Sequence, residues 1–424
     1  MLAKMADVRP FRALRYDPVL DLSAIVCPPF DIISPGLQRE LYERSPYNAV
    51  RIELAEDTGH GRYENAAATL GQWIEEGVLR RDERPAFYLH RQTFQHGGRE
   101  YTRSMLFGRL RVVPWSEGSV LPHEQTFGGP KEDRLRLMRA AHINASPVFL
   151  FYRDAAGKAR RLLKAAMEQA PAAEFDAPGG QHHALRKLDD RAIVDGLTDA
   201  FAGETLYIAD GHHRFETALA YRDVVKAGSP SWTGEEPENF ALAALVAYDD
   251  PGMLVLPTHR IVNADVRWHD AEERLWPLFD WGLAPDAFEK AIAEREAIGL
   301  VVRGVGSLLL TVKDCEAVDR LLPQERSAQW RALDYAIANH VVMRYGLGLS
   351  EDVMNDRAKV WFSEEVAEAI EAVESGAARY AVLLKPAPVA TVLALADGGE
   401  KMPQKSTFFW PKAPTGVVFN LLED

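Results

Sequence analysis

The sequence predicts an α/β protein of mixed α+β type with more than one domain. The chain has 424 residues, of which 47% are hydrophobic and 26% charged. This is ordinary globular composition, and the chain is longer than one hydrophobic core usually serves. Short apolar runs bounded by polar turns alternate with segments of helical period, which indicates sheets covered by helices. We therefore expect two or three domains.

Residues 1–155 are expected to form an N-terminal α/β region. Apolar runs rich in β-branched and aromatic residues predict strands, and apolar spacing of three and four predicts helices. The expected strands lie at 24–33, 48–54, 86–94, 103–113 and 146–152, and the expected helices at 64–79 and 131–141.

Residues 156–265 are expected to form the core of the protein. A helix is predicted over 158–170, and the Gly-Gly pair in 177–188 predicts a turn in which His182 and His183 are solvated. The segment 204–225 reads as a strand, a sharp polar turn and an amphipathic helix, and a further strand is predicted over 240–248.

Residues 266–424 are expected to form a C-terminal α/β region whose Lys-Ser-Thr segment returns to the site. The spacing predicts helices over 271–281, 286–300 and 329–347. Strands are predicted over 305–312, 378–386 and 388–397, and the turn-rich last segment is expected to end in a strand.

Charge and cysteine content exclude several classes of protein. The net charge of -13 argues against a general nucleic-acid surface, because phosphate backbones bind basic faces. Neither a secretory leader nor a long apolar span is visible, so we expect a cytoplasmic protein without a membrane partner. Two cysteines, Cys27 and Cys315, cannot form a disulfide framework or a cysteine-rich zinc site. Cys27 is interpreted as a small buried hydrophobe.

The strongest local signal is the segment from Asp210 to Arg214. A strand ends at Asp210, Gly211 permits a tight turn and a helix follows, so free backbone N–H groups would face an anion. His212, His213 and Arg214 add donors suited to phosphate. The alternative is structural, with Asp210 capping the helix, one histidine packed and Arg214 in a local salt bridge.

Other site types have less support in the sequence. No metal site is expected, because neighbouring histidines point in different directions and no HExxH spacing accompanies them. P-loop, Rossmann and α/β-hydrolase motifs are absent. A nucleotide would therefore have to be held in another way.

Two resemblances emerge from these motifs. The stretch ADGHHRFETAL resembles the strand-turn-helix signature of the ParB and sulfiredoxin superfamily, whose members hold nucleotide phosphates and include kinases of free serine. The chain is also similar to the family called domain of unknown function 1015. The segments that carry this second likeness are PPFDIIS, SPYNAVRIEL, LPHEQTFGGPKEDRLRL, NASPVFLFY, ADGHHRFETAL, LPTHR and MPQKSTFFWPK. They imply a ParB/sulfiredoxin-like nucleotide-binding core with an additional α/β domain.

The segment LPHEQTFGGPKEDR groups further candidates around a Gly-Gly-Pro loop. Glu124 is the first choice for a base that takes a hydroxyl proton, and Asp31 of PPFD is the second. His123 is a third catalytic candidate, while Lys131 and Arg134 could balance phosphate charge, although a solvated helix face explains them too.

Three more residues are candidates for the phosphate site. Asn48 and Arg51 could line it from a strand over 48–54, in which Arg51 and Glu53 would share a side, but a surface strand has the same pattern. Lys405 lies in a turn near the end that also holds Lys412, and either lysine could neutralise phosphate. His259 and Arg260 of LPTHR equally suit a strand end.

The expected function is that of a nucleotide-dependent phosphotransferase acting on a small hydroxyl-bearing metabolite, with free serine as the leading acceptor. In this hypothesis the cofactor is ATP or ADP with Mg²⁺. One alternative is a phosphatase or nucleotide hydrolase that uses the same phosphate site, and another is a non-catalytic nucleotide-binding regulator. The sequence does not determine the acceptor, the nucleotide or the oligomeric state.

Overall fold

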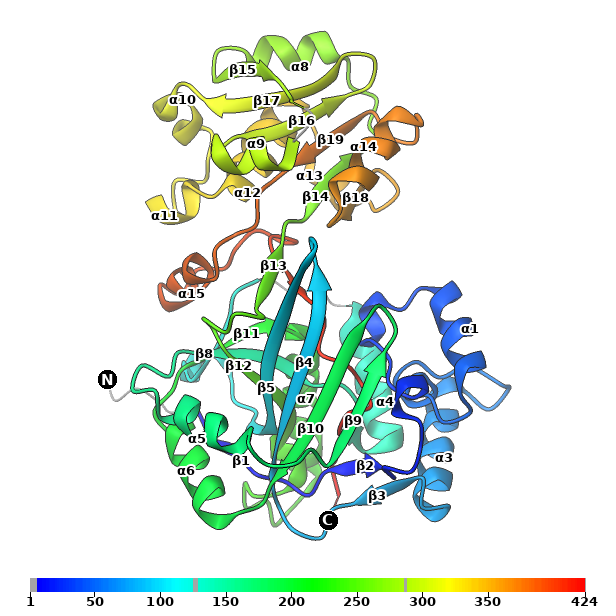
Figure 1. Cartoon of the computed structure of the whole chain (residues 1–424). Helices are drawn as coiled ribbons and strands as arrows, with labels where there is room; N and C mark the ends of the chain where they lie inside the picture. Colours follow the sequence, from blue (N-terminus) through cyan, green and yellow to red (C-terminus); the bar gives the residue numbers. More distant parts are fainter. Residues whose placement is uncertain (1–5, 125–128, 286–287, 424) are drawn as a thin grey trace. The chain divides into compact units, whose positions relative to one another are not determined.

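The computed structural model describes residues 6–124, 129–285 and 288–423. The chain divides into two compact units (Figure 1). Unit 1 comprises Met1–Pro122, Thr126–Leu254 and Pro411–Asp424, and unit 2 comprises His123–Gln125 and Val255–Trp410. The sheet of unit 1 continues across residue 155, where the sequence suggested a boundary, while the expected boundary near 265 lies close to the passage into unit 2.

Unit 1 is built on a large mixed sheet. Its main path runs in the order β6-β11-β8-β12-β5-β4-β10-β9, and β1 pairs with β5. Its strands are β1 (Val8–Arg9), β4 (Phe87–His96), β5 (Arg99–Arg111), β6 (Val120–Pro122), β8 (Val148–Tyr152), β9 (Ala173–Ala177), β10 (Gln181–Leu188), β11 (Leu206–Asp210) and β12 (Phe240–Ala247). The β6–β11 and β8–β12 pairs are parallel and the others antiparallel.

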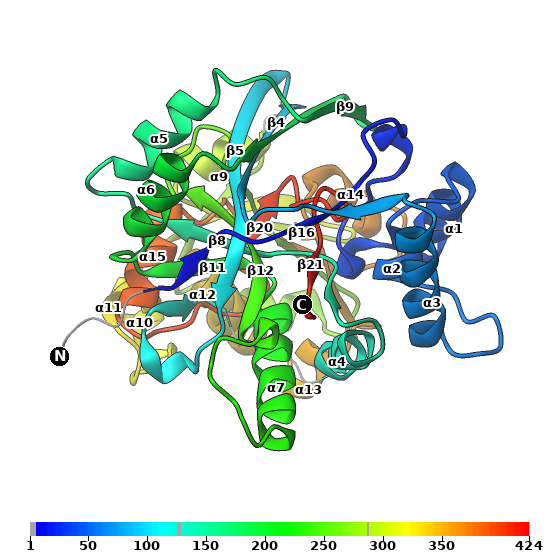
Figure 2. The same cartoon turned by 90° about the horizontal axis from the view of Figure 1, so that it is seen from below.

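Helices cover this sheet and bury two clusters of apolar side chains. One cluster joins the sheet to α5 (Lys158–Ala166), α6 (Arg191–Phe201) and α7 (His212–Gly228). The other lies among α1 (Pro35–Arg44), α2 (Val50–Glu53) and α3 (Arg62–Glu75). Helix α4 (Gly129–Ala141) packs on both α3 and α7 (Figure 2). The short helices of the unit are η1 (Leu22–Ala24), η2 (Phe30–Ile32), η3 (Trp115–Glu117) and η4 (Pro237–Asn239).

The last residues of the chain return to unit 1 and pair with its N-terminal part. Strand β21 (Asn420–Leu421) pairs with β7 (Ile143–Asn144), and β2 (Leu14–Tyr16) pairs with β3 (Leu79–Arg81). Cys27 exchanges two backbone hydrogen bonds with Thr415, at 3.1 and 2.8 Å. Cys27 is buried, and this burial raises the pKa of its thiol, which agrees with its interpretation as a small buried hydrophobe.

Unit 2 is built on an antiparallel sheet in the order β15-β17-β16-β19-β14-β18. Its strands are β14 (His259–Val262), β15 (Phe279–Leu283), β16 (Ile298–Val302), β17 (Gly306–Val312), β18 (Val360–Ser363) and β19 (Tyr380–Leu383). Strand β13 (Leu254–Leu256) pairs with β20 (Phe408–Trp410). The helices are α8 (Trp268–Leu275), α9 (Phe288–Glu294), α10 (Cys315–Arg320), α11 (Ala328–Arg331), α12 (Asp334–Ile337), α13 (Glu351–Asn355), α14 (Val366–Glu374) and α15 (Val389–Asp397).

The single long helix expected over 329–347 is divided in the structure. Helix α11 ends at Arg331, and α12 then leads directly into a π-helical stretch, η5 (Ala338–Gly346). At its end the Leu347 N–H donates to the Val342 carbonyl, five residues earlier, at 2.9 Å. Stretches of π-helix are rare and often occur at functional sites.

Four further expectations from the sequence are corrected. The run 24–33 is not a strand but an isolated bridge at Cys27 followed by η2, because Pro28 and Pro29 have no N–H for a ladder. The segment 48–54 contains helix α2 instead of a strand. The run 388–397 forms helix α15, since continuous apolar runs do not distinguish strand from helix. The pair His182–His183 belongs to β10, in a hairpin whose turn holds the two glycines.

The helices of the described ranges include none whose length and apolar character would allow it to cross a membrane.

Candidate functional site

The strand-turn-helix at Asp210 forms as the sequence predicts. Strand β11 ends at Asp210, and α7 begins at His212. Gly211 has a φ of 86°, in the left-handed region that glycine enters at little cost. A Cβ atom at this position would also lie 2.8 Å from Nε of Arg214. Glycine is therefore needed both for the turn and for the path of the arginine side chain.

The Asp210 carboxylate is held by two cations within unit 1. Arg214 Nη2 donates to Oδ2 at 2.5 Å, and Lys412 Nζ donates to Oδ1 at 2.7 Å. Burial would raise the pKa of Asp210, but the charges of Lys412, Arg214 and His212 outweigh it and hold the pKa well below its usual range. Asp210 therefore stays ionised, and the group carries one more positive than negative charge.

Arg214 has the structural role that the sequence left as an alternative. Besides Asp210, its guanidinium donates through Nη1 to the carbonyl of Pro147, and the residue is buried. Two of its three nitrogens are thus engaged within the protein. His212 and His213 are half-buried in the first turn of α7. The first backbone N–H groups of a helix have no acceptor within that helix, and His212 and His213 lie beside them in α7.

A second buried carboxylate, Glu53, connects three other motifs. Its Oε1 accepts the backbone N–H of Phe30 at 3.1 Å and the hydroxyl of Ser146 at 2.9 Å. Arg134 Nη1 lies 3.9 Å from the same oxygen and donates to the Glu53 carbonyl at 2.7 Å. The Arg134 guanidinium also lies over the Phe30 ring, 4.1 Å from its centroid. Glu53 is 1% exposed, so these contacts replace water as its partners.

The two carboxylate networks meet at neighbouring residues. Ser146 bonds to Glu53, and the next residue, Pro147, accepts from Arg214. A continuous path of contacts therefore runs from the PPFD segment through the NASP segment to the Asp210 turn. Asp31, the residue after Phe30, is exposed in η2. It is the acidic residue of this path that faces solvent.

Helix α4 contributes residues whose charges are already balanced. Lys131 forms an ion pair with Glu216 of α7. Arg134 Nη2 contacts Asp133 at 2.5 Å, and the same carboxylate accepts from the Tyr63 hydroxyl at 2.8 Å. Lys131 and Arg134 thus fasten α4 to α7 and to α2, and their expected part in phosphate binding stays a prediction.

Asn48 and Arg51 do not lie on a strand, and both donate to backbone carbonyls of neighbouring segments. Asn48 is fully buried, donates to the Ala24 carbonyl at 2.8 Å and accepts the Val50 N–H at 3.0 Å, so it caps the start of α2. Arg51 donates to the Tyr42 carbonyl at 2.9 Å, and its guanidinium lies 4.2 Å from the centroid of the Tyr42 ring. Both residues stabilise the packing of α1 and α2.

His123 and Glu124 form a separate group within unit 2. His123 Nε2 lies 2.7 Å from Oγ1 of Thr407. Glu124 Oε1 accepts the Ser406 N–H at 2.9 Å. Lys405 is exposed and has a φ of 56°. The structure thus joins His123 and Glu124 to the KST segment, while Gln125–Gly128 lie outside the described residues.

The histidine pair in β10 has two different environments, and neither resembles a metal site. Contacts with Asp176 and Glu174 raise the pKa of the exposed His182. Burial lowers the pKa of His183 to about 4, and its Nδ1 lies 2.9 Å from Nε2 of His90. Within the ranges that the structure describes, no group of three or more His, Cys, Asp or Glu side chains is arranged to hold a metal ion.

Sequence reasoning missed three contributors to the Asp210 and Glu53 networks. The sequence predicts a strand around Glu53 and the start of a strand at Ser146. It favours Lys405 over Lys412 as a residue of the site. A signal existed for Glu53, because a carboxylate among apolar neighbours in NAVRIEL needs a buried partner. Nothing local indicated that Lys412 would reach Asp210, 202 residues earlier.

Comparison with known proteins identifies the family of the chain. The profile of the family described as "Protein of unknown function (DUF1015)" matches residues 8–336. The chain belongs to this family. None of the curated proteins matches it.

Several solved structures are distantly similar to this DUF1015 protein. A conserved hypothetical protein from Pyrococcus furiosus is 15% identical, with 75% of this chain and 95% of that chain covered and a TM-score of 0.36. A free serine kinase in complex with AMP is 15% identical, with 75% and 92% covered and a TM-score of 0.37. SbnI with a C-terminal truncation, from Staphylococcus aureus, is 12% identical, with 74% and 86% covered and a TM-score of 0.37. Likeness at this level does not assign an activity.

Proposed function

We propose that unit 1 binds the phosphates of a nucleotide at the start of α7 and transfers a phosphoryl group to a small hydroxyl-bearing metabolite, with free serine as the first acceptor to test. The observation that carries the proposal is the charge at the turn. Arg214 and Lys412 face the single carboxylate of Asp210, at the N-terminus of a 17-residue helix. The excess cation and the helix dipole both favour an anion there.

Each residue of the turn has a defined part in this proposal. The first N–H groups of α7, together with His212 and His213, donate hydrogen bonds to phosphate oxygens. Arg214 is a positioning residue, because its guanidinium fixes the turn to Asp210 and Pro147. Lys412 adds a second positive charge beside Asp210. Phosphoryl transfer depends mainly on such positioning and charge stabilisation.

In this proposal Asp31 contacts the hydroxyl group of the acceptor. This carboxylate is exposed and directly follows Phe30, whose N–H is fixed by Glu53. A carboxylate in this position would orient the hydroxyl and accept its proton. Glu124, the first choice from the sequence, belongs to unit 2 and already accepts from Ser406, so its role as a base stays a prediction.

The donor set of the turn fits a nucleotide phosphate, whereas the part of the chain that the structure describes holds no acidic cluster for a metal ion. Mg²⁺ would therefore enter with the nucleotide, bound chiefly by phosphate oxygens, and would offset phosphate charge. The likeness of ADGHHRFETAL to the ParB and sulfiredoxin superfamily also favours a nucleotide phosphate at this turn. Membership of that superfamily stays a prediction.

Nucleotide binding is tested by thermal melting with ATP, ADP and AMP, each with and without Mg²⁺. A ligand of the folded state raises the melting temperature by mass action. Lys412→Met removes the excess charge but keeps the Asp210–Arg214 pair, so we expect about tenfold weaker binding, the value of one lost charge contact. Lys226→Met removes an exposed lysine at the far end of α7 and should change nothing. If no nucleotide shifts the melting temperature of the native protein, the proposal fails.

Phosphoryl transfer is tested by incubating the protein with the bound nucleotide and serine and measuring phosphoserine by mass spectrometry. Asp31→Asn should retain nucleotide binding and lose roughly 100-fold or more of the rate, the usual contribution of a general base. Glu40→Gln, at an exposed carboxylate of α1, is the matched control. Release of free phosphate without an acceptor would indicate a hydrolase, and binding without turnover would indicate a regulator.

A further inference from the structure

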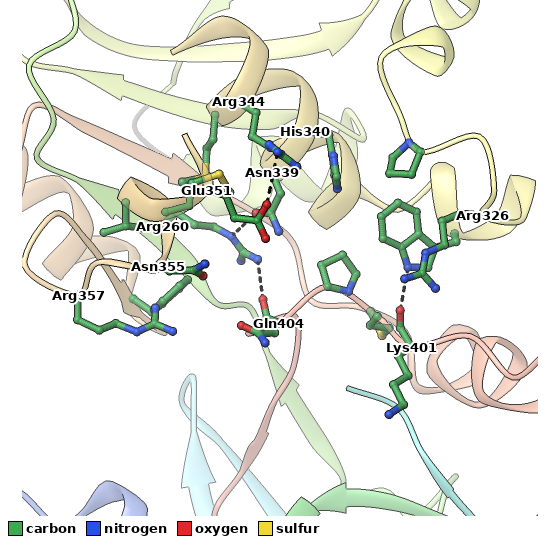
Figure 3. Close-up of a pocket in the computed structure, with 18 of the residues that line it drawn as sticks. Arg260, Arg326, Asn339, His340, Arg344, Glu351, Asn355, Arg357, Lys401 and Gln404 are labelled. Atoms are coloured by element: carbon green, nitrogen blue, oxygen red, sulfur yellow. Dashed lines mark hydrogen bonds and ion pairs between the residues drawn. The ribbon is translucent and has the colours of Figure 1, made fainter. Parts of the chain in front are cut away.

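Unit 2 contains a cavity of about 400 Å³ that the function proposed for unit 1 does not use (Figure 3). Its walls come from β14, η5, α13, β18, the segment before α11 and the loop Lys401–Gln404. The volume falls within the range of sites for small molecules, and all lining residues belong to unit 2.

The lining of this cavity is cationic although the chain as a whole is acidic. The chain has a net charge of -13, yet the cationic side chains in the wall outnumber the carboxylates. The cations are Arg260, Arg326, Arg344, Arg357 and Lys401, and the carboxylates are Glu325 and Glu351. Arg344 and Glu351 approach each other at 3.7 Å. A cluster of like charges in an acidic protein is costly unless an anion offsets it.

Arg260 is the buried centre of this cluster. The residue is 1% exposed, and its guanidinium donates to the carbonyls of Thr258 and Gln404 and to the side chain of Asn339. Among the described residues it makes no ion pair with a carboxylate. Burial consequently lowers the pKa of Arg260 to about 10. Its hydrogen bonds go to neutral acceptors, and the charge of Glu124 acts on it without a direct ion pair. Arg260 lies at the wall of a cavity, where an anion could approach it (Figure 3).

The π-helical stretch η5 aims polar and apolar groups into the same space. Asn339 and Met343 lie four residues apart, as do His340 and Arg344, and all four line the cavity. Asn339 Oδ1 accepts from Arg260 Nε at 3.2 Å. The wider turn at Leu347 thus belongs to the helix that builds this wall, in agreement with the frequent occurrence of π-stretches at binding sites.

Aromatic rings complete the wall and carry arginines on their faces. The Arg326 guanidinium lies 5.2 Å from the centroid of the Trp330 ring, and that of Arg357 lies 4.7 Å from the centroid of the Phe362 ring. A planar guanidinium can contact phosphate through two N–H donors at once. Rings and thioethers beside the cations would accept the flat organic part of a ligand.

We propose that this cavity is a binding site for a small organic phosphate, with Arg260, Arg326 and Arg357 as the phosphate ligands and the rings of Trp330 and Phe362 as contacts for a planar group. The site is distinct from the turn at Asp210 and does not depend on the function proposed for unit 1. Phosphate is favoured over a single carboxylate because its two negative charges match the surplus of cations.

The test is calorimetric titration of the full chain with pyrophosphate, AMP and citrate. We expect the two phosphates to bind, and Arg326→Met and Arg357→Met each to weaken binding at least about tenfold, since each removes one charge contact. Arg357 is exposed and Arg326 is half-buried, so the variants should fold. Arg320→Met, at an exposed arginine of α10, is the matched control and should bind as the native chain does.

The outcomes separate this proposal from that for unit 1. Weakened pyrophosphate binding in the two arginine variants, together with unchanged binding in Lys412→Met, supports a site in unit 2. Binding that Lys412→Met abolishes and the arginine variants retain would overturn it. So would the absence of pyrophosphate and AMP binding, and citrate binding more tightly than either phosphate would overturn the assignment to phosphate.

Discussion

Each unit buries an arginine, Arg214 beside Asp210 in unit 1 and Arg260 at the cavity of unit 2. The two arginines have opposite kinds of hydrogen-bond partner. Arg214 is paired with an ionised carboxylate at 2.5 Å and assisted by Lys412. Arg260 is more deeply buried, with 1% of its surface exposed against 9% for Arg214, and it is held by two carbonyls and an amide oxygen. The first arrangement fixes a turn, because removing the Asp210 carboxylate takes away a partner of both cations. The second leaves a positive charge that an incoming anion can neutralise.

This difference shows that a sequence motif rich in donors need not present all of them to a ligand. Arg214 is the most suggestive residue of the Asp210 turn, yet its guanidinium works inside the protein. Arg260 stands in an unremarkable LPTHR segment and lines a cavity. Four variants or conditions test the contrast.

Asp210→Asn should give the largest loss of stability. The change removes the carboxylate that Arg214 and Lys412 share, and breaking a buried ion pair in this way costs about 3–5 kcal/mol. Urea unfolding of the full chain, followed by hydrogen exchange in α7, measures the loss. Asp195→Asn, at a side chain that is 68% exposed, is the control and should change stability little. A small effect at Asp210 would mean that the group is not a structural unit.

Acidification should destabilise both units at nearly the same pH. Burial lowers the pKa of His183 in unit 1 and of His259 in unit 2 to about 4, below the ordinary value of 6.5. The unfolded chain then binds more protons, so stability is present above about pH 6.5 and is lost as pH falls toward 4, by about 3 kcal/mol for each histidine.

In His183→Phe the free energy of unfolding, measured across this pH range, should depend less steeply on pH in unit 1 and as before in unit 2. The ring stacks 4.8 Å from the Phe175 centroid, which makes phenylalanine a suitable replacement. An unchanged pH dependence in the variant would show that His183 is not a source of the acid sensitivity.

Gly211→Ala should cost about 2 kcal/mol, because a left-handed residue with a Cβ costs roughly 1–2 kcal/mol and the added atom also meets Arg214. Gly203→Ala is the control, since a Cβ there meets nothing within 4 Å. Thermal unfolding of both variants measures the difference. Equal melting temperatures would argue against a tight turn at Asp210.

Arg260→Met should have the smallest effect on stability, about 1 kcal/mol or less. The change removes three hydrogen bonds but also a buried charge, and apolar replacement of buried charge is often nearly neutral. Methionine keeps contact with the Tyr335 and Phe362 rings that the arginine covers. A cost as large as that of Asp210→Asn, measured by the same urea unfolding, would erase the contrast between the two groups.

The sequence by itself determined the mixed α/β class, most strands and helices, and the turn at Asp210. These features depend on local patterns: apolar periodicity, a glycine between strand and helix, and polar residues at the turn. Local patterns gave the wrong element where residues distant in the sequence determine a residue's environment. The run 388–397 has the composition of a strand but forms helix α15, and NAVRIEL forms a helical turn whose Glu53 is buried against Ser146.

Only the tertiary structure decided which charged side chains pair with groups inside the protein and which line a cavity. The partners of Asp210 include Lys412, far along the chain, and the cavity around Arg260 collects its wall from segments between residues 260 and 404. Such contacts follow from how strands and helices pack, because a long side chain reaches whatever group packing brings within a few ångströms. The composition of the chain limits which charged groups are present but does not determine which of them come into contact.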